Sequence, residues 1–515
     1  MSIRTVLLSL VAVAAVGFGG TPAFADGGSG VVRVDTGWLR GKVSDDLVTY
    51  TGIPYAEPPV GQRRWRPPAD PVSWQGIRDA TKPGTPCPQQ RLESAEDCLY
   101  LDVTAPRTRR GGLKPVLVWL YGGAFNTGAA KEFDGARLAT SGDVVVVSMN
   151  YRLGALGFLS SPVLDGSGGN YGLMDQAAAL RWVQRNARRF GGDPGNVTLA
   201  GQSAGARAVC AHLASPLSQG LFHRAISQSG ACDNDVLTLS AAQAFGAQAI
   251  EQLGCAKAAD VAACLRGQSV EKLLGTLAGV GFAFNGKVSD RPWNPVAGTP
   301  MLPKQPKDVL RDGTGARVPL MIGSTRDEMR MFVSWESNMT AGRYTELVRQ
   351  TFGERADDVL TTYPVGNYGS PALAMSAVLS DWGGAIGACP VLRTAEAASA
   401  HQPVYAYEFA EDSGQVTQTG FPQGSYHGLD LPYLWDLDMA QNPYPPLTAK
   451  QKRLSAKIVG YWTAFARTGN PNGPARPHWP EDAVIKLSSE GIAPTPFAAD
   501  HHCGFWSGIS RRATR

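Results

Sequence analysis

Short apolar runs alternate along the chain with longer amphipathic stretches that are rich in Ala, Leu and Arg. Runs of this length without polar alternation are typical of strands that are buried on both faces of a sheet. They cover residues 114–121, 143–149, 196–200, 225–228, 318–322 and 404–409. Helical periodicity covers residues 171–189, 204–213 and 448–468. The alternation predicts an α/β fold in which a large, mostly parallel central sheet is flanked by helices.

The pattern also indicates how the chain is divided. Residues 26–55 are interpreted as a small antiparallel meander at the N-terminal edge of the sheet. We find no internal repeat and no linker-like run in the rest of the sequence. Residues 26–515 are therefore expected to form a single domain.

The first 25 residues have the pattern of a secretory signal. One Arg is followed by an apolar run from Val6 to Phe18, and Ala23-Phe24-Ala25 stands before Asp26. The apolar run is too short to cross a bilayer, which argues against a membrane anchor. We expect a signal peptide over residues 1–25, cleavage near Ala25 and Asp26, and a secreted, extracellular protein without a stable membrane anchor.

Composition and charge restrict the class of protein further. Of the 515 residues, 43% are hydrophobic and 18% charged, which favours a substantial core over a disordered chain. The formal net charge of +4 is too small to predict a nucleic-acid partner.

Eight cysteines form an even set, which favours disulfides in an exported chain. Cys87 with Cys98, and Cys255 with Cys264, would each close a short loop. The close pairing of Cys or His that a zinc site needs is missing. The sequence alone leaves the full connectivity open.

Candidate chemistry is concentrated at Gly201-Gln202-Ser203-Ala204-Gly205, between a predicted strand and a predicted helix. That context is the one that a nucleophile elbow requires, although an ordinary Gly-rich turn has the same pattern. A serine nucleophile needs a base and donors for an oxyanion. Residues 121–125 (YGGAF) follow another predicted strand and could supply backbone N–H donors. A phosphate-binding loop is a poor alternative there because no Lys-Ser/Thr follows.

Three motifs in order make the sequence similar to the type-B carboxylesterases, the α/β-hydrolase family that includes the cholinesterases. Residues 190–205 (FGGDPGNVTLAGQSAG) match the serine signature of the family, and residues 96–103 (EDCLYLDV) match its second signature. Residues 465–472 (FARTGNPN) resemble a C-terminal family motif. The similarity extends from about Gly37 to the C-terminus and implies a carboxylic ester hydrolase with no metal or organic cofactor.

The resemblance implies a catalytic triad of Ser203 as nucleophile, Glu328 as acid and His427 as base, in the chain order expected for this fold. From the residues alone, Asp327 competes with Glu328 for the role of the acid. The other histidines are weaker candidates for the base: His212 and His223 are expected on a helix surface, and His501 and His502 in a polar tail. Also left as alternatives are His401 and His478.

The resemblance also implies an oxyanion hole formed by the N–H groups of Gly123, Ala124 and Ala204. It implies the disulfides Cys87–Cys98, Cys255–Cys264 and Cys389–Cys503. A fourth bridge between Cys210 and Cys232 stays open, because the resemblance assigns no partner to either, although both lie near the predicted elbow helix and the strand after it. The implied scaffold ion pairs are Arg64–Glu96 and Arg152–Asp175.

Two departures from the family bear on the substrate. Gln202 stands where the family usually has Glu, and the loop between Cys87 and Cys98 lacks the Trp that contacts choline in cholinesterases. We therefore expect a small-molecule ester that is neutral. An interfacial lipase or polyester hydrolase, with residues 280–293 as a lid, is one alternative. A non-catalytic adhesion or scaffold homologue is another. The sequence predicts no oligomeric state.

Overall fold

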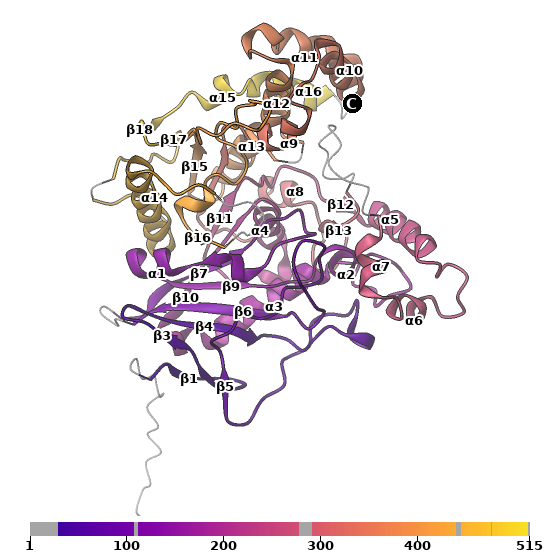
Figure 1. Cartoon of the computed structure of the whole chain (residues 1–515), viewed down its shortest axis with the longest axis vertical. Helices are drawn as coiled ribbons and strands as arrows, with labels where there is room; N and C mark the ends of the chain where they lie inside the picture. The colour runs from indigo at the N-terminus through magenta and orange to yellow at the C-terminus, as the bar shows by residue number, and fades with distance from the viewer. Residues whose placement is uncertain are drawn as a thin grey trace, which may run out of the picture.

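The computed structural model describes residues 29–107, 112–277, 291–384, 386–438, 444–474 and 476–512. The proposed signal peptide and residues 280–290 of the proposed lid lie outside these ranges. Within them, eleven strands form one mixed sheet in the order β18-β17-β15-β14-β11-β10-β7-β9-β6-β4-β3 (Figure 1). The predicted α/β architecture is confirmed.

The strands from β9 to β17 in this order run parallel, and antiparallel strands complete both edges. The parallel strands are β7 (Lys114–Leu120), β9 (Val145–Met149), β10 (Gly192–Gln202), β11 (Arg224–Gln228), β14 (Leu320–Thr325), β15 (Val404–Phe409) and β17 (Val484–Ser488). The edge strands are β3 (Lys42–Val43), β4 (Leu47–Pro54), β6 (Tyr100–Pro106) and β18 (Gly491–Pro494). Every residue of β7, β9, β14 and β15 is buried, as their unbroken apolar runs predict.

Helices cover both faces of the sheet, which positions the connections between strands. On one face, α1 (Ala136–Gly142) packs on α14 (Ala449–Thr468), and α14 packs on β7. On the other, α3 (Tyr171–Asn186), α4 (Ala204–Ala214) and α13 (Ala388–Ser399) pack on β10, β11 and β14. The N-terminus of α14 is fixed by a capping box, in which the Thr448 side chain accepts from the Gln451 N–H and the Gln451 side chain accepts from the Thr448 N–H.

The N-terminal strands differ from the single meander expected over residues 26–55. They pair antiparallel, but in two sheets: β3 and β4 belong to the edge of the large sheet, whereas β1 (Val31–Val34) and β2 (Gly37–Arg40) form a separate small sheet with β5 (Ile77–Asp79). The two sheets are separate because β2 pairs in parallel with β5, which is distant in the sequence.

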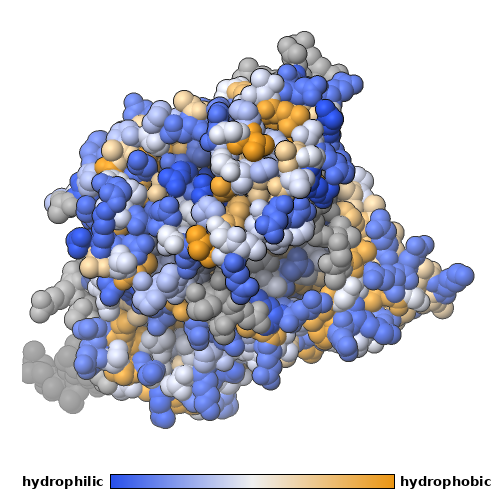
Figure 2. Space-filling view, turned by 45° about the horizontal axis from the view of Figure 1, so that its top comes forward, coloured by the Kyte–Doolittle hydropathy of each residue, from blue (hydrophilic) through white to orange (hydrophobic). Residues whose placement is uncertain are grey.

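A second hydrophobic cluster, which we call the helical cluster, is formed by helices at one end of the molecule (Figure 1). It comprises α9 (Arg330–Val333), α10 (Ala341–Phe352), α11 (Ala356–Thr362), α12 (Pro371–Trp382) and α16 (Cys503–Arg512) with adjoining residues. On the face in Figure 2, hydrophobic side chains are dispersed between polar ones. None of the helices in the described ranges has both the length and the apolar character that crossing a membrane requires.

His501 lies at the junction of the helical cluster and the sheet. Its Nδ1 donates to Asp381 Oδ1 (2.6 Å) and its Nε2 to Glu408 Oε1 (2.7 Å). Burial by itself lowers the pKa of His501, but the hydrogen bonds and negative charges of Asp381 and Glu408 raise it to about 10. The expectation of a polar tail is wrong for His501, which is only 4% exposed because two buried carboxylates surround it.

Four disulfides use all eight cysteines. The structure joins the three pairs implied by the resemblance and also joins Cys210, on α4, to Cys232, after β11. The other pairs are Cys87–Cys98, Cys255–Cys264 and Cys389–Cys503. Cys389–Cys503 links α13 to α16 and so attaches the C-terminal helix to the rest of the chain.

Candidate active site

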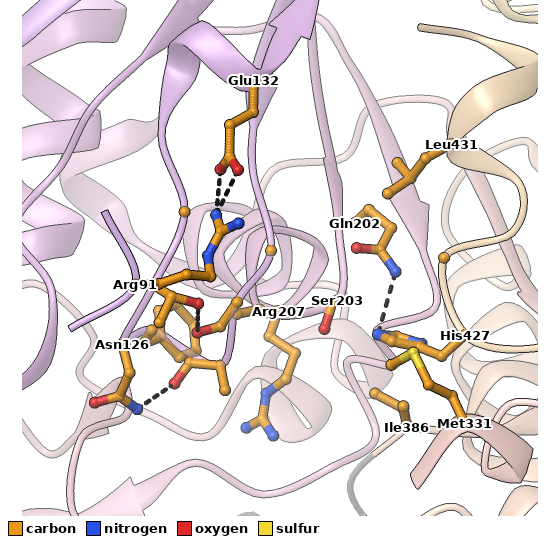
Figure 3. A pocket seen from close by; sticks show the side chains of 18 of the residues that line it. Arg91, Asn126, Glu132, Gln202, Ser203, Arg207, Met331, Ile386, His427 and Leu431 are labelled. Atoms are coloured by element: carbon orange, nitrogen blue, oxygen red, sulfur yellow. Dashed lines mark hydrogen bonds and ion pairs between the residues drawn. The ribbon is translucent and has the colours of Figure 1, made fainter. Parts of the chain in front are cut away.

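A cavity of about 540 Å³ lies beyond the carboxyl ends of β7 and β10, where ligand sites of open α/β sheets are found. Ser203 and His427 both line it (Figure 3). Its apolar lining includes the side chains of Phe125, Phe133, Met331, Phe332, Ile386 and Leu431.

Ser203 occupies a strained turn between β10 and α4. Its backbone has φ +57° and ψ −121°, its N–H donates to Gln228 O (2.8 Å), and its carbonyl accepts from Arg207 N–H (3.0 Å). A Cβ at Gly205 would lie 1.9 Å from the carbonyl oxygen of Leu120. The small residues of the motif are therefore required by close packing of α4 against β7, and the turn directs the Ser203 side chain into the cavity.

Glu328 and His427 are joined by a short hydrogen bond of 2.5 Å between Oε2 and Nδ1. Glu328 follows β14, is fully buried, and its Oε1 accepts from the Thr325 N–H (2.8 Å). The neighbouring Asp327 turns elsewhere: it accepts from the Ser425 N–H and pairs with Arg330. The structure thus brings Glu328, and not Asp327, to the imidazole.

The Nε2 atom of His427 faces the amide of Gln202, with 3.2 Å between the two nitrogens (Figure 3). An amide nitrogen can only donate, so Nε2 accepts and the proton of the neutral ring lies on Nδ1, towards Glu328. The Ser203 hydroxyl makes no hydrogen bond within the described part of the chain. Nε2 therefore has the lone pair that a general base needs, and Gln202 currently occupies it.

The turn after β7 lies directly against Ser203. A Cβ at Gly122 would lie 2.9 Å from the Ser203 Cβ, and Gly123 has φ +109°, with no space for a side chain beside Thr127. Ala124 is also in the left-handed region, at φ +54°. Within the described ranges, the N–H groups of Gly123, Ala124 and Ala204 donate to no other protein group. These donors border the cavity and are available to an oxygen held beside Ser203.

Comparison with known proteins identifies the family. The model of the "Carboxylesterase family" matches residues 28–490. The chain belongs to the carboxylesterase family. It is 33% identical over 502 residues to a cocaine esterase of Homo sapiens, covering 89% of this chain and 86% of that protein. It is 34% identical to the para-nitrobenzyl esterase of Bacillus subtilis (strain 168), covering 87% and 92%. A solved structure of a PNB esterase superimposes with a TM-score of 0.79 at 33% identity, covering 92% of this chain and 99% of that one. The protein is therefore a carboxylic ester hydrolase.

The other described histidines of this carboxylesterase lie outside the lining of the cavity. His212 was expected on a helix surface, but it is fully buried, where its ring bonds to Gln176 and Ser218 and burial lowers its pKa to about 3. His223 Nδ1 accepts from the Val197 N–H (3.1 Å). The ion pairs implied by the resemblance, Arg64–Glu96 (2.5 Å) and Arg152–Asp175 (2.7 Å), are both formed away from the cavity lining.

The arginines of the cavity were missed in the sequence. Arg91, Arg207 and Arg291 line it, together with one carboxylate among the described residues, that of Glu132. A signal existed for Arg207, because it stands four residues after Ser203 in the predicted helix and so lies on the same helix face. Arg91 and Arg291 lie in segments without periodicity, and only the fold brings them to the cavity.

Proposed function

We propose that this carboxylesterase acts through an acyl-enzyme on Ser203, with His427 as general base and Glu328 as its orienting carboxylate. The observation that carries the proposal is the 2.5 Å bond between His427 Nδ1 and buried Glu328, beside a serine held at φ +57° in the same cavity. Buried Glu328 fixes the tautomer that leaves Nε2 unprotonated and stabilises the imidazolium when it forms.

The mechanism begins with an exchange of hydrogen bonds. His427 Nε2 leaves the Gln202 amide and takes the proton of Ser203 as the hydroxyl attacks the ester carbonyl. The N–H groups of Gly123, Ala124 and Ala204 hold the oxyanion. His427 then protonates the departing alcohol, and water repeats the sequence on the acyl-enzyme to release the acid.

The substrate that this site favours carries no cationic group. The described residues that line the cavity include no tryptophan, and the carboxylate of Glu132 already accepts from Arg91 (2.6 Å). Gln202 places a neutral amide beside the base where a Glu would attract a cation. A quaternary ammonium group would therefore find neither an unpaired carboxylate nor a tryptophan, the ring that binds cations best, among the described residues of this lining.

We also propose that the protein works outside the cytoplasm. All eight cysteines are paired, and such a set of bridges is maintained in oxidising compartments. The secretory pattern of residues 1–25 supports the same location.

The test compares butyrylcholine with its uncharged isostere, 3,3-dimethylbutyl butyrate, in the natural protein and in Gln202→Glu. We expect kcat/KM of the natural protein to be no higher for the choline ester. Gln202→Glu should raise the relative rate on the choline ester and move the acid limb of the pH–rate profile to higher pH, because a carboxylate beside the imidazolium favours its protonated form.

Two results would contradict this proposal. Turnover of neither ester would argue against ester hydrolysis in this cavity. A tenfold preference of the natural protein for the choline ester, worth about 1.4 kcal/mol, would require a recognition of cations that the site lacks.

A further inference from the structure

One cation in the active-site cavity has no carboxylate partner among the residues that the structure describes. Arg207 projects from α4 into the cavity below Ser203 (Figure 3), and only 5% of its surface is exposed. Its Nη2 donates to the backbone oxygen of Asp235 (3.1 Å). Its Nε and Nη1 are buried and have no hydrogen-bond partner in the described part of the chain. Three of the five N–H donors of the guanidinium are thus left without an acceptor.

The charges around Arg207 do not compensate for it. The carboxylate of Asp235 pairs with Lys307 (2.8 Å), so that Asp235 offers Arg207 only its main-chain oxygen. Arg291, which also lines the cavity, adds a second positive charge nearby. Burial lowers the pKa of Arg207 to about 9, the charge of Arg291 lowers it as well, and Asp235 opposes this. Arg207 is still charged at neutral pH.

A second arginine of the cavity, Arg91, is paired with a carboxylate. Arg91 donates to both oxygens of Glu132, which is itself nearly fully buried. The cavity therefore holds one neutral pair, Arg91 with Glu132, and one arginine, Arg207, whose charge no described carboxylate balances.

A buried guanidinium without a counter-ion is costly, and proteins normally pair such a group. A structural role in holding Asp235 requires one N–H group and leaves the remaining donors unexplained. Carboxylates satisfy guanidinium donors with strong, charge-assisted hydrogen bonds. An anion brought by the substrate would supply the acceptors that the described residues do not provide.

We infer that the preferred substrate is an ester that bears a carboxylate in addition to the ester group, and that Arg207 binds this carboxylate. The inference rests on the proposed function and replaces the neutral ester expected from the sequence with an anionic one. Hydrolysis breaks the ester bond with water and gives an alcohol and an acid, and the second carboxylate is unchanged. Arg207 is in this sense a residue that determines specificity.

The test uses two matched pairs of esters, because the carboxylate could lie in the acyl part or in the alcohol part. In the first pair, the 4-nitrophenyl monoester of adipic acid is compared with 4-nitrophenyl 6-oxoheptanoate, in which methyl replaces the anionic oxygen. In the second, 3-butyryloxybenzoate is compared with 3-acetylphenyl butyrate. Each kcat/KM is divided by the rate of alkaline hydrolysis of the same ester.

We expect the anionic ester to be preferred at least about tenfold in one pair, as a hydrogen-bonded ion pair should give. Arg207→Met should reduce that ratio to within about twofold of unity. The ratio does not depend on the fraction of protein that is folded, because both esters meet the same sites. As a control, Arg185→Gln removes the same charge from the outer side of α3, where Arg185 pairs with Asp35, and should keep the natural ratio.

Distinct results overturn the inference and the proposed function. Turnover of the uncharged esters with no anionic preference in either pair overturns the inference alone, as does a preference that survives in Arg207→Met. If none of the four esters is hydrolysed, the proposed function fails. Calorimetry with the hydrolysis-resistant amide analogues then decides the inference, which requires tighter binding of an anionic amide and loss of that difference in Arg207→Met.

Discussion

Replacing Ser203 with Ala should lower kcat/KM for an uncharged aryl ester by about 10⁴-fold or more, because the members of a triad act as a unit. The turn that holds residue 203 is defined by backbone bonds to Gln228 and Arg207, which alanine keeps. We therefore expect the melting temperature to stay close to that of the natural protein. Initial rates at matched protein concentrations measure the loss, and active-site titration of the natural protein gives its concentration of active sites.

A second serine provides a matched control. Ser229 follows β11, is buried, and has a similar positive φ of +55°, but it does not line the cavity. Ser229→Ala should retain most of the activity. A fluorophosphonate should label Ser203 in the natural protein and nothing in Ser203→Ala. Retention of more than about a hundredth of the natural activity in Ser203→Ala would remove Ser203 from the role of nucleophile.

Replacing Glu328 with Gln should cost on the order of 10³- to 10⁴-fold in kcat, since a neutral amide neither fixes the required tautomer nor stabilises the imidazolium. The two side chains have nearly the same shape. The loss should therefore appear in kcat while the fold, measured by circular dichroism, is kept.

Asp327→Asn is the matched control for this prediction. Asp327 accepts from the Ser425 N–H and pairs with Arg326 and Arg330, so its loss should mainly lower the melting temperature. If Asp327→Asn reduced kcat more than Glu328→Gln, the roles assigned to the two carboxylates would have to be exchanged.

Much of the fold could be predicted because local apolar runs in the sequence mark its strands. The apolar runs at residues 114–121 and 404–409 correspond closely to β7 and β15, where burial on both faces removes any polar alternation. The predicted start of β10 was late by four residues. Its first residue, Gly192, pairs with Lys114 before a register shift, and no hydrophobic pattern marks that segment.

The candidate site could be predicted where its residues are consecutive in the sequence. The turn around Ser203 needs small neighbours, and these are visible in the sequence. The bond between Gln202 and His427 joins residues 225 positions apart and depends on how the chain returns to β10. The same holds for Arg207, whose charge is visible in the sequence but whose lack of an acceptor is a property of the packed structure.

Because Asp381 and Glu408 both hydrogen-bond to His501, the folded protein binds a proton at His501 more tightly than the unfolded chain does. With the pKa of His501 raised to about 10, against about 6.5 for an unfolded histidine, folding takes up a proton between these two values. The stabilisation is complete below pH 6.5 and is lost as the pH rises towards 10, at a slope of up to about 1.4 kcal/mol per pH unit. Urea unfolding should show the natural protein and His501→Gln converging in stability over this interval. A constant difference in the free energy of unfolding between the two proteins would mean that folding does not bind a proton at His501. The stability of the junction between the sheet and the C-terminal helix would then not depend on the titration of His501.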